Sequence, residues 1–431
     1  MNLKEMAGKS RDAFFDLSVA GLAKRNLALV KMAEELEADR EAIFAANEED
    51  LRQAEAEGLA APLLKRLKFG SEKLRQVQEG LRALSRLPDP IGKTVFCHEI
   101  TEGLKLYRVT CPIGVIGIIF ESRPDALIQI ASLAVKSGNT ALLKGGREAL
   151  RTNQELIRSV RRALEKAGLP ADAAQLMETR EDVAAMLKED ELIDLIIPRG
   201  SNAFVRYIMD NSRIPVLGHA DGICHVYVDR DAKLETAWKV ALDSKMQNVS
   251  VCNAAETLLV HEDIAEAFLP AFAGQLRRCG AEIRGDEKTR QIIDCGEATE
   301  EDWRTEYLDA ILSIRVVPTL EAAIDHINRY GSHHTDCIIT ENDKTAAEFL
   351  NRVDSAGVYR NVSTRFADGF VYGLGAEVGI ATGKIHSRGP MGLDGLTTYK
   401  YKLLGSGQTM AEMKDGSREY THRVLPEDCP L

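Results

Sequence analysis

Residues 112–120 of the chain are PIGVIGIIF, an almost unbroken apolar run. A strand that is buried on both faces has this composition, whereas a strand with one face in water alternates apolar and polar residues. Helical periodicity follows at 125–136, and Gly138 stands where a helix end favours glycine. A second apolar strand is predicted at 140–143. This alternation predicts a parallel, doubly wound α/β sheet.

The same alternation extends towards the C-terminus. The first unit continues with a helix around 156–167 and strands at 192–197 and 224–228. A second alternating unit covers 230–360, with predicted helices at 234–246, 263–279, 320–328 and 344–352 and predicted strands at 257–261, 311–317 and 337–340. A chain of 431 residues is long enough for two or three domains with full cores.

The segments outside these two units have other patterns. Residues 3–90 have the periodicity of amphipathic helices, and the pair 94–100 and 104–109 has the pattern of a hairpin. Residues 361–391 form a long glycine-rich segment, which in a compact domain is functional or disordered; its aromatic and glycine content favours order. A last strand is predicted at 397–401, and the tail after residue 405 is expected to be poorly structured.

Composition excludes several classes of protein. A net charge of −11 argues against a general nucleic-acid-binding surface, and no apolar run approaches the length of a membrane span. The N-terminus enters an amphipathic helix without a signal-peptide pattern. The eight cysteines are scattered, with no CxxC pair and no metal-ligand spacing. We therefore expect a protein of the reducing cytoplasm with no metal and no membrane partner.

One cysteine lies in a polar loop between a predicted helix and a predicted strand. Residues 247–260 are QNVSVCNAAETLLV, with the thiol at Cys252. Such a loop is held by rigid elements and leaves the thiol open to substrate, which favours a reactive cysteine. The alternative is a small buried apolar residue, because free cysteines are among the most buried residue types.

Two loops predict an anion or nucleotide site. Lys144-Gly145-Gly146-Arg147 follows one strand, and Arg199-Gly200-Ser201-Asn202 follows another. Ligands of parallel sheets bind beyond the carboxyl ends of the strands, where bare glycines let backbone N–H groups approach an anion. Tight turns with incidental charge are the alternative. The Rossmann pattern G-x-G-x-x-G is absent at a strand–helix junction.

Long segments of the chain carry a resemblance to a known family. They are PIGVIGIIFESRPDA at 112–126, KSGNTALLKGG at 136–146, PRGSNAFVRYIMDNSRIPVLGHADGICHVYVD at 198–229, VCNAAETLLVH at 251–261, INRYGSHHTD at 327–336, DSAGVYRNVSTRFADGF at 354–370 and GLGAEVGIATGKIHSRGPMGLDGLTTYKY at 373–401. Over nearly its whole length the chain resembles the aldehyde dehydrogenase superfamily and, within it, the gamma-glutamyl phosphate reductase family.

The resemblance implies two doubly wound α/β domains and a small β oligomerisation element. The cofactor-binding domain is expected to comprise 1–93 and 111–229. The catalytic domain with its nucleophile is expected at 230–365, followed by a loop-rich closing segment at 366–395. The hairpin at 94–110 and the strand at 396–405 match the oligomerisation elements of the superfamily, so a homodimer or homotetramer is expected.

The resemblance also implies an activity. It is the NADPH-dependent reduction of L-glutamyl 5-phosphate to L-glutamate 5-semialdehyde and phosphate, through a thioester on a cysteine, in L-proline biosynthesis. A glutamate kinase is the partner that would transfer the substrate. Two rivals stay open, namely a hydrolytic aldehyde dehydrogenase that uses NAD and a catalytically silent homologue that serves as a binding subunit.

The resemblance assigns roles to individual residues. Cys252 matches the nucleophile, and Lys144 matches the lysine at the adenosine ribose. Arg147 stands where NAD-preferring relatives carry a glutamate, which favours the 2′-phosphate of NADP. Glu306 aligns with the glutamate that holds the nicotinamide ribose. The two anion loops supply the remaining predicted cofactor-binding positions, Gly145, Gly146, Gly200 and Ser201.

Two segments depart from the superfamily pattern. The segment 219–222 is HADG where the general-base glutamate of E-L-G-G is found, and 120–124 is FESRP where the asparagine of P-W-N is found. Losing the base suits acyl-phosphate chemistry, because phosphate and not water is the partner of the thioester. The oxyanion donors that remain are the Cys252 N–H and either Ser122 or Asn253. The candidate cations for the phosphate and the α-carboxylate of the substrate are Arg123, Arg365, Lys384 and Arg388.

Overall fold

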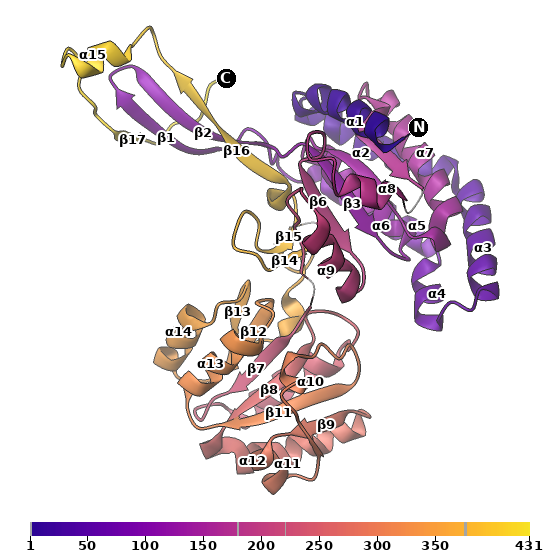
Figure 1. Cartoon of the computed structure of the whole chain (residues 1–431), viewed down its shortest axis with the longest axis vertical. Coiled ribbons are helices and arrows are strands. Elements are labelled where there is room, and N and C mark those ends of the chain that lie inside the picture. The colour runs from indigo at the N-terminus through magenta and orange to yellow at the C-terminus, as the bar shows by residue number, and fades with distance from the viewer. Residues whose placement is uncertain (1, 179–180, 220, 375–376) are drawn as a thin grey trace.

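The protein has two α/β units and a narrow projecting sheet (Figure 1). The computed structural model describes residues 2–178, 181–219, 221–374 and 377–431. The unit that carries the N-terminus and the second unit lie one above the other, and the projecting sheet extends away from the first of them. Among the described residues, none of the helices has both the length and the apolar composition that crossing a membrane requires.

The first unit is built on a parallel sheet with the strand order β5-β4-β3-β6. Its strands are β3 (Val115–Phe120), β4 (Thr140–Lys144), β5 (Ala174–Met177) and β6 (Leu195–Arg199). Every residue of β3 is buried, as its apolar composition predicted. Ile116 and Ile118 face one hydrophobic core, and Val115 and Ile119 face another.

Helices cover both faces of this sheet, which is why β3 has no polar face. The larger core packs α2 (Leu22–Ala38), α3 (Arg40–Ala56), α5 (Ser71–Arg86), α6 (Pro124–Lys136) and α7 (Leu150–Lys166) against it. The smaller core packs α1 (Leu3–Ser18), α8 (Glu181–Met186) and α9 (Asn202–Asn211) on the opposite face. The short helix α4 (Ala61–Leu67) follows α3 at the edge of the unit.

The second unit has a seven-stranded sheet with the order β10-β9-β11-β8-β7-β12-β13, in which every pair is parallel. Its strands are β7 (Cys224–Val228), β8 (Ala255–His261), β9 (Glu282–Gly285), β10 (Gly296–Glu297), β11 (Ile311–Val317), β12 (Thr335–Ile339) and β13 (Gly357–Arg360). Its helices are α10 (Leu234–Met246), α11 (Glu262–Arg278), α12 (Glu287–Ile292), α13 (Leu320–Tyr330) and α14 (Asp343–Arg352). Alternate side chains of β8 again face two different cores, with Leu258 in one and Leu259 in the other.

The structure corrects the predicted boundary between the two units. Residues 111–229 were expected in the cofactor-binding domain, but β7 lies in the middle of the second sheet, where Val226 pairs with Leu258 and with Cys337. An apolar strand of five buried residues fits either parallel sheet. Which of the two sheets the strand joins depends on pairing with residues far away in the chain, and the local sequence does not indicate that pairing. The second unit therefore begins before residue 224.

The projecting sheet is antiparallel, with the order β16-β2-β1-β17. It contains the predicted hairpin β1 (Thr94–Thr101) and β2 (Leu104–Pro112) and the predicted last strand β16 (Thr397–Leu404). The expectation of a poorly structured tail after residue 405 is wrong. The tail forms α15 (Met410–Lys414) and then β17 (Arg423–Leu425), which pairs with β1. The strand β17 is short and includes a charged residue, so its own sequence does not predict a strand. It forms because it pairs with β1, which is far away in the chain.

The glycine-rich segment at 361–391 is ordered over its described residues, as its composition predicted. It contains the 3₁₀ turn η4 (Thr364–Phe366) and the strands β14 (Gly379–Ala381) and β15 (Gly389–Met391), which pair with each other. Val378, Ala381 and Met391 are buried in the larger core of the first unit. The segment therefore leads the chain from the second unit back to the first.

Candidate active site

The candidate site lies where the two α/β units meet. The amino ends of β8, β7 and β12 are neighbours in the second sheet, because all three strands are parallel. The segments that enter these strands carry Cys252, Gly222 and His334. The carboxyl ends of β4, β3 and β6 are neighbours in the first sheet, and the loops that leave them carry the predicted cofactor-binding residues.

The elements on both sides of the cysteine loop are joined to each other. Lys245 in the last turn of α10 and Glu256 in β8 are fully buried and form an ion pair. Burial raises the pKa of Glu256 to about 7, and burial lowers the pKa of Lys245. The Leu308 N–H also donates to Glu256, at 3.4 Å. The pair fixes the distance between helix and strand, so the loop between them has little freedom.

The glycine-rich segment fastens the loop from a second side. The Asn253 side-chain amide donates to the Ala367 carbonyl at 2.9 Å, and the Thr364 hydroxyl donates to the Asn253 carbonyl at 2.7 Å. Arg365 lies in the same 3₁₀ turn and donates from Nε to the side-chain oxygen of Gln247 at 2.9 Å. The structure thus brings the predicted Arg365 to the cysteine loop. It uses the Asn253 amide as an anchor of the loop, with its N–H groups turned to backbone carbonyls.

The backbone of Cys252 is held from behind. The Cys224 thiol donates to the Cys252 carbonyl at 3.3 Å, and burial raises the pKa of Cys224 well above its usual range, so that this thiol keeps its proton. Gly222 lies so close that a Cβ there would be 2.3 Å from the Cys252 carbonyl oxygen and 2.5 Å from its Cα. Cys252 itself is half-buried, whereas Cys224 and Cys337 are fully buried. This difference favours the reactive role over that of a buried apolar residue.

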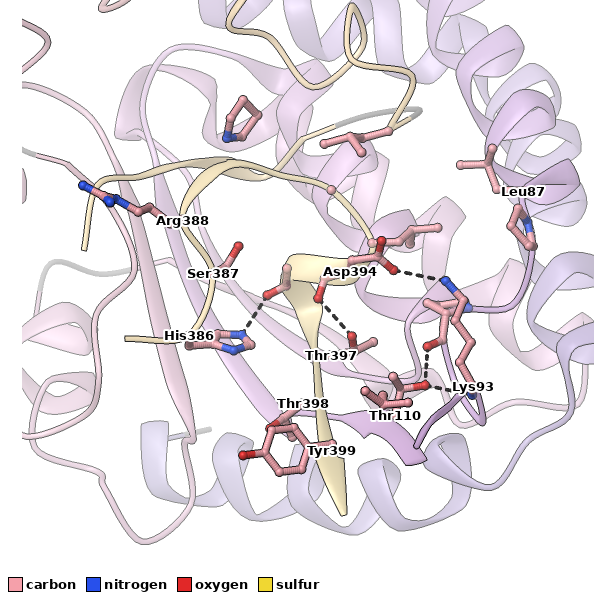
Figure 2. Close-up of a pocket in the computed structure, with 18 of the residues that line it drawn as sticks. Leu87, Lys93, Thr110, His386, Ser387, Arg388, Asp394, Thr397, Thr398 and Tyr399 are labelled. Carbon is pink, nitrogen blue, oxygen red and sulfur yellow. Dashed lines mark hydrogen bonds and ion pairs between the residues drawn. The ribbon is translucent and has the colours of Figure 1, made fainter. Parts of the chain in front are cut away.

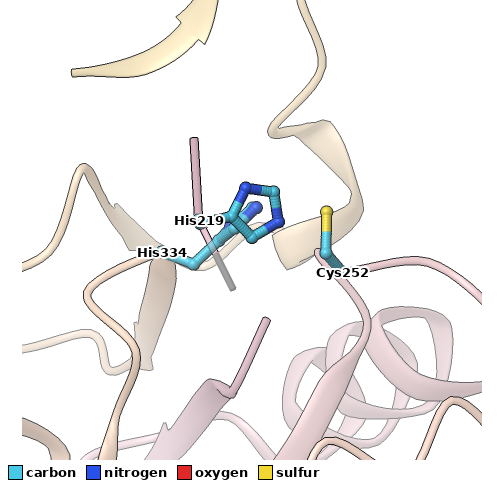
Figure 3. Close-up of side chains that lie close together, drawn as sticks. All are labelled: His219, Cys252 and His334. Atoms are coloured by element: carbon cyan, nitrogen blue, oxygen red, sulfur yellow. The ribbon is translucent and has the colours of Figure 1, made fainter. Parts of the chain in front are cut away.

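Two imidazoles lie beside the thiol (Figure 3). Cys252 Sγ and one ring nitrogen each of His219 and His334 lie within 4.8 Å of one another, and the two ring centroids are 5.0 Å apart. His219 Nδ1 lies 2.9 Å from the Ile380 carbonyl, so Nδ1 carries the proton and Nε2 a free lone pair. The sequence analysis missed His334, because no spacing motif relates it to the other two. The feature that could have indicated His334 is its position directly before a strand of the same sheet.

Arginines add positive charge near the thiol. Arg199 ends β6, and burial lowers the pKa of Arg199, while the nearby Glu377 acts in the opposite direction. The charges of the predicted Arg123 and of Cys252 also act on the pKa of Arg199. Burial raises the pKa of Glu377. The sequence analysis gave Arg199 only a place in an anion loop.

Ser122 is turned towards a neighbouring loop. Its backbone lies in the left-handed region with φ +42°, and both its N–H and its hydroxyl donate to Glu148 Oε1, at 2.8 and 2.6 Å. A Cβ on Gly146 would lie 2.0 Å from that same Glu148 oxygen, so a side chain there would displace the carboxylate. Glu148 thus ties the loop after β3 to the loop after β4. In this arrangement the Ser122 hydroxyl stabilises the loop by donating to Glu148, and it donates no hydrogen bond to Cys252.

The other predicted cofactor-binding residues lie on the same edge of the first sheet. Lys144 ends β4 and donates from Nζ to the Gly145 carbonyl at 2.6 Å. Arg147 is exposed at the mouth of the loop and pairs with Glu57 at 2.9 Å. A Cβ on Gly145 would lie 2.2 Å from the Asn153 amide nitrogen. Gly145 is buried, whereas Gly146 is partly exposed and Arg147 is exposed, so a ligand beyond the strands can reach the loop at these two residues.

The loop after β6 reaches the second unit. The Ser201 N–H donates to Glu121, and burial raises the pKa of that carboxyl. Gly200, directly before Ser201, is exposed. Asn202 donates from its side-chain amide to Glu306 Oε2 at 2.5 Å and to Asp221 Oδ1 at 3.0 Å. Glu306 therefore stands at the junction of the two units, opposite the cofactor loops.

The segment that carries Glu306 is anchored by Asp302. Burial acts to raise the pKa of Asp302, but hydrogen bonds from Thr299, Arg284 and Tyr307 outweigh it and hold the pKa below its ordinary range. Each of these donors lies 2.7 Å from an oxygen of the carboxylate. A carboxyl whose pKa is lower in the folded state stabilises the fold above its unfolded pKa, and this contribution is lost as the pH falls.

We expect Asp302→Asn to reduce the free energy of unfolding at pH 7 by about 1–3 kcal/mol, because the neutral amide loses charge-assisted hydrogen bonds. The wild type should lose stability more steeply than the variant when the pH is lowered from about 5 to 3. Urea unfolding at a series of pH values measures both. Glu301→Gln is the matched control, because Glu301 is exposed on the same turn. Equal pH slopes for Asp302→Asn and wild type would contradict the role of the carboxylate.

Lys384 and Arg388 share one acidic partner. Both pair with the Asp354 carboxylate, at 2.5 and 3.0 Å, and their hydrogen bonds lower the pKa of Asp354. Arg388 also lines a cavity of about 580 Å³ at the base of the projecting sheet, together with Asp394 and Tyr399 (Figure 2). The structure thus groups these two predicted cations with Asp354, while it groups Arg123 and Arg365 with the Cys252 region.

Comparison with known proteins assigns the family. The sequence pattern of the aldehyde dehydrogenase family matches residues 1–292, about two thirds of the chain. The chain belongs to the aldehyde dehydrogenase family. Membership confirms the predicted fold of two α/β units and makes the protein an oxidoreductase that uses a nicotinamide cofactor.

Among aldehyde dehydrogenases, the chain is similar to proteins named gamma-glutamyl phosphate reductase. It is 56% identical over 428 residues to the protein of that name from Pelotomaculum thermopropionicum, covering 99% of both chains. It is 54% identical to the one from Acetivibrio thermocellus, covering 100% of both. The crystal structure of the Thermotoga maritima gamma-glutamyl phosphate reductase superposes with a TM-score of 0.93 at 41% identity, covering 95% of this chain and 100% of that one.

The cofactor requirement of an aldehyde dehydrogenase fits the residues of this site. Gly145 and Gly146 let the loop pack closely against Asn153 and Glu148, which a side chain at either position would displace. Lys144 and Arg147 supply positive charge at the same loop, and Glu306 supplies an acceptor across the junction. Cations at the loops and a carboxylate across the junction are groups that suit the phosphates and the ribose hydroxyls of a dinucleotide.

Proposed function

We propose that the protein reduces L-glutamyl 5-phosphate to L-glutamate 5-semialdehyde with NADPH and releases phosphate, as a step of L-proline biosynthesis. The identity of 54–56% over almost the full length of two proteins named gamma-glutamyl phosphate reductase supports the substrate. The position of Cys252 at the junction of the two units, with no glutamate in the segment 219–222, supports the mechanism.

The thiolate of Cys252 attacks the acyl carbon of the substrate. The bond to the phosphate oxygen breaks, phosphate leaves with the electron pair, and a thioester forms. The bound nicotinamide cofactor supplies the hydride that reduces this acyl group. The resulting thiohemiacetal collapses, so that the aldehyde leaves and Cys252 returns to its thiolate form.

The protein positions the anionic groups and the developing oxyanion. Arg365 donates to Gln247 in the Cys252 loop, and the charges of Arg123 and Cys252 both act on Arg199. These three arginines suit the phosphate and the α-carboxylate of the substrate. We assign the oxyanion to the Cys252 N–H, because the side chains of Ser122 and Asn253 already donate to other acceptors. Lys384 and Arg388 become substrate cations only if they leave Asp354.

The preference for NADP rests on Arg147. Its exposed guanidinium pairs with Glu57, and the carboxylate is a partner that a 2′-phosphate would replace. A glutamate at position 147 would repel that phosphate, whereas an arginine pairs with it.

The assembly and the partners follow from the same resemblance. The projecting sheet exposes Tyr399, Tyr401, Leu403 and Val424, which supports an oligomerisation surface for a homodimer or homotetramer. A glutamate kinase would be the source of the unstable acyl phosphate. We place the protein in the cytoplasm, where its eight free cysteines stay reduced.

The test is the reverse reaction, the oxidation of L-glutamate 5-semialdehyde, followed by cofactor absorbance with and without inorganic phosphate. We expect reduction of NADP that depends on phosphate, and slower reduction of NAD. Oxidation that proceeds equally without phosphate would show that water accepts the acyl group. The place of His219 beside Cys252 favours that second function, a hydrolytic dehydrogenase in which His219 is the base. If the semialdehyde were oxidised neither with nor without phosphate, both the phosphate-dependent reductase and the hydrolytic dehydrogenase would be overturned.

A further inference from the structure

We propose that Cys252, His219 and His334 form a binding site for a zinc ion, and that zinc blocks the nucleophile reversibly. The three donors come from three separate segments, before β7, β8 and β12. Their donor atoms, one sulfur and two imidazole nitrogens, lie within 4.8 Å of one another (Figure 3). Such a set is invisible to sequence spacing, because the fold alone brings the three segments together.

The donor chemistry selects the metal. Thiolate and imidazole are the ligands that zinc prefers, whereas magnesium and calcium take oxygen ligands. Zinc bonds of about 2.0–2.3 Å in a tetrahedral site place neighbouring ligand atoms about 3.5 Å apart. Side-chain rotations that shorten the present separations by about 1 Å would therefore complete the arrangement.

The surroundings orient the imidazoles as they do in metal sites. His219 donates from Nδ1 to the Ile380 carbonyl at 2.9 Å, which leaves Nε2 as a free ligand atom. Metal-binding histidines generally donate their other N–H to a carbonyl or a carboxylate in this way. A carbonyl partner therefore already fixes the tautomer that zinc requires.

His334 supplies an independent observation. Its side chain is 1% exposed, its Nδ1 lies 3.0 Å from the Thr335 hydroxyl, and its Nε2 has no partner among the described residues. A buried polar atom without a partner costs free energy, so such an atom in a native structure calls for a partner, which a bound ion or a water can supply. The ring packs edge to face against His219, which places it on the wall next to Cys252.

Three protein ligands leave the fourth zinc position to water or to a substrate carboxylate. On binding, the Cys252 thiol loses its proton to solvent and the thiolate electron pair bonds to the metal. That pair is then withheld from the acyl carbon, so zinc inhibits whatever reaction the thiol performs. The inference concerns the nucleophile of the proposed function and does not depend on the identity of its substrate.

The test uses cobalt as a spectroscopic probe of the metal-free, full-length protein. We expect one equivalent of Co²⁺ to give a thiolate-to-cobalt charge-transfer band, and one equivalent of Zn²⁺ to remove it. The band should be absent in Cys252→Ala. In His219→Ala and His334→Ala the affinity should fall by at least about tenfold, since each loses a ligand. Cys279→Ala and His98→Ala are the matched controls, because Cys279 is exposed on another face and His98 lies in the projecting sheet.

A band that persists in Cys252→Ala, or an affinity unchanged in both histidine variants, would overturn the zinc site. So would the absence of any band in the wild type. Thermal unfolding of each variant shows that it is folded, which keeps loss of the band interpretable. A band together with no oxidation of the semialdehyde would sink the proposed function and leave the metal site standing. Phosphate-dependent oxidation without a band would overturn the metal site and leave the proposed function standing.

Discussion

Replacing Cys252 with alanine should reduce turnover by at least about 10³-fold, because no thioester can form without the sulfur. The half-buried thiol sits at the junction of the two units, and no other cysteine is found in its loop. The cofactor loops after β4 and β6 do not touch the Cys252 side chain in any hydrogen bond described here, so binding of NADPH should persist. Steady-state rates and cofactor titration by fluorescence measure the two properties separately.

Cys279→Ala is the control for this substitution, because Cys279 is exposed at the end of α11 and should tolerate the change. If Cys252→Ala kept a tenth or more of wild-type turnover, the nucleophile would have to be another residue. Loss of cofactor binding together with turnover would instead indicate a disrupted junction between the units.

The fold was predictable wherever the burial of an element determines the hydrophobic pattern of its own residues. The apolar run of β3 predicted a strand covered on both faces, and the structure buries every residue of it. β7 is buried at every residue as well, and a strand buried on both faces fits either parallel sheet, so its sequence did not indicate which of the two it joins. The strand β17 is paired with β1 through residues more than three hundred positions apart, and nothing local in a charged tail indicates such a partner.

The site was predictable in part. A polar loop between a helix and a strand singled out Cys252, and glycines beyond two strands singled out the anion loops. The resemblance to aldehyde dehydrogenases then assigned roles at the cofactor to residues of these loops. His334 and Gly222 were not recognised, and Arg199 was recognised only as part of an anion loop, because their role beside Cys252 arises from proximity. The resemblance also left the partners of Ser122 and Asn253 open. In the structure the Ser122 hydroxyl donates to Glu148, and the Asn253 side-chain amide donates to the Ala367 carbonyl.

Gly222 shows how a residue without functional groups can control the nucleophile. It belongs to the segment that replaces the E-L-G-G motif, and no other glycine of the described chain approaches the Cys252 backbone in this way. Its φ does not lie in the left-handed region, so conformational freedom does not explain the glycine. The requirement is space, since any Cβ would occupy the volume of the Cys252 backbone.

We expect Gly222→Ala to reduce turnover by about 10²-fold or more, because a displacement of about 1 Å at a reacting atom has an effect of this size. The added Cβ would lie 2.3 Å from the Cys252 carbonyl oxygen and 2.5 Å from its Cα and Cβ, so the loop has to move. Neither Lys245 nor Asn253 allows an easy shift, because the ion pair to Glu256 and the hydrogen bond to Ala367 hold the loop on its other sides.

The matched control is Gly218→Ala in the same connection, where the new Cβ would meet Pro198 at an ordinary 3.5 Å. Rates for both variants, together with the rate at which a thiol reagent modifies Cys252, separate a displaced nucleophile from general unfolding. A displaced nucleophile predicts slower turnover and altered modification in a protein whose Tm falls by only a few degrees. Wild-type turnover in Gly222→Ala would mean that the loop yields to the side chain without consequence, and that the close approach of Gly222 does not position Cys252.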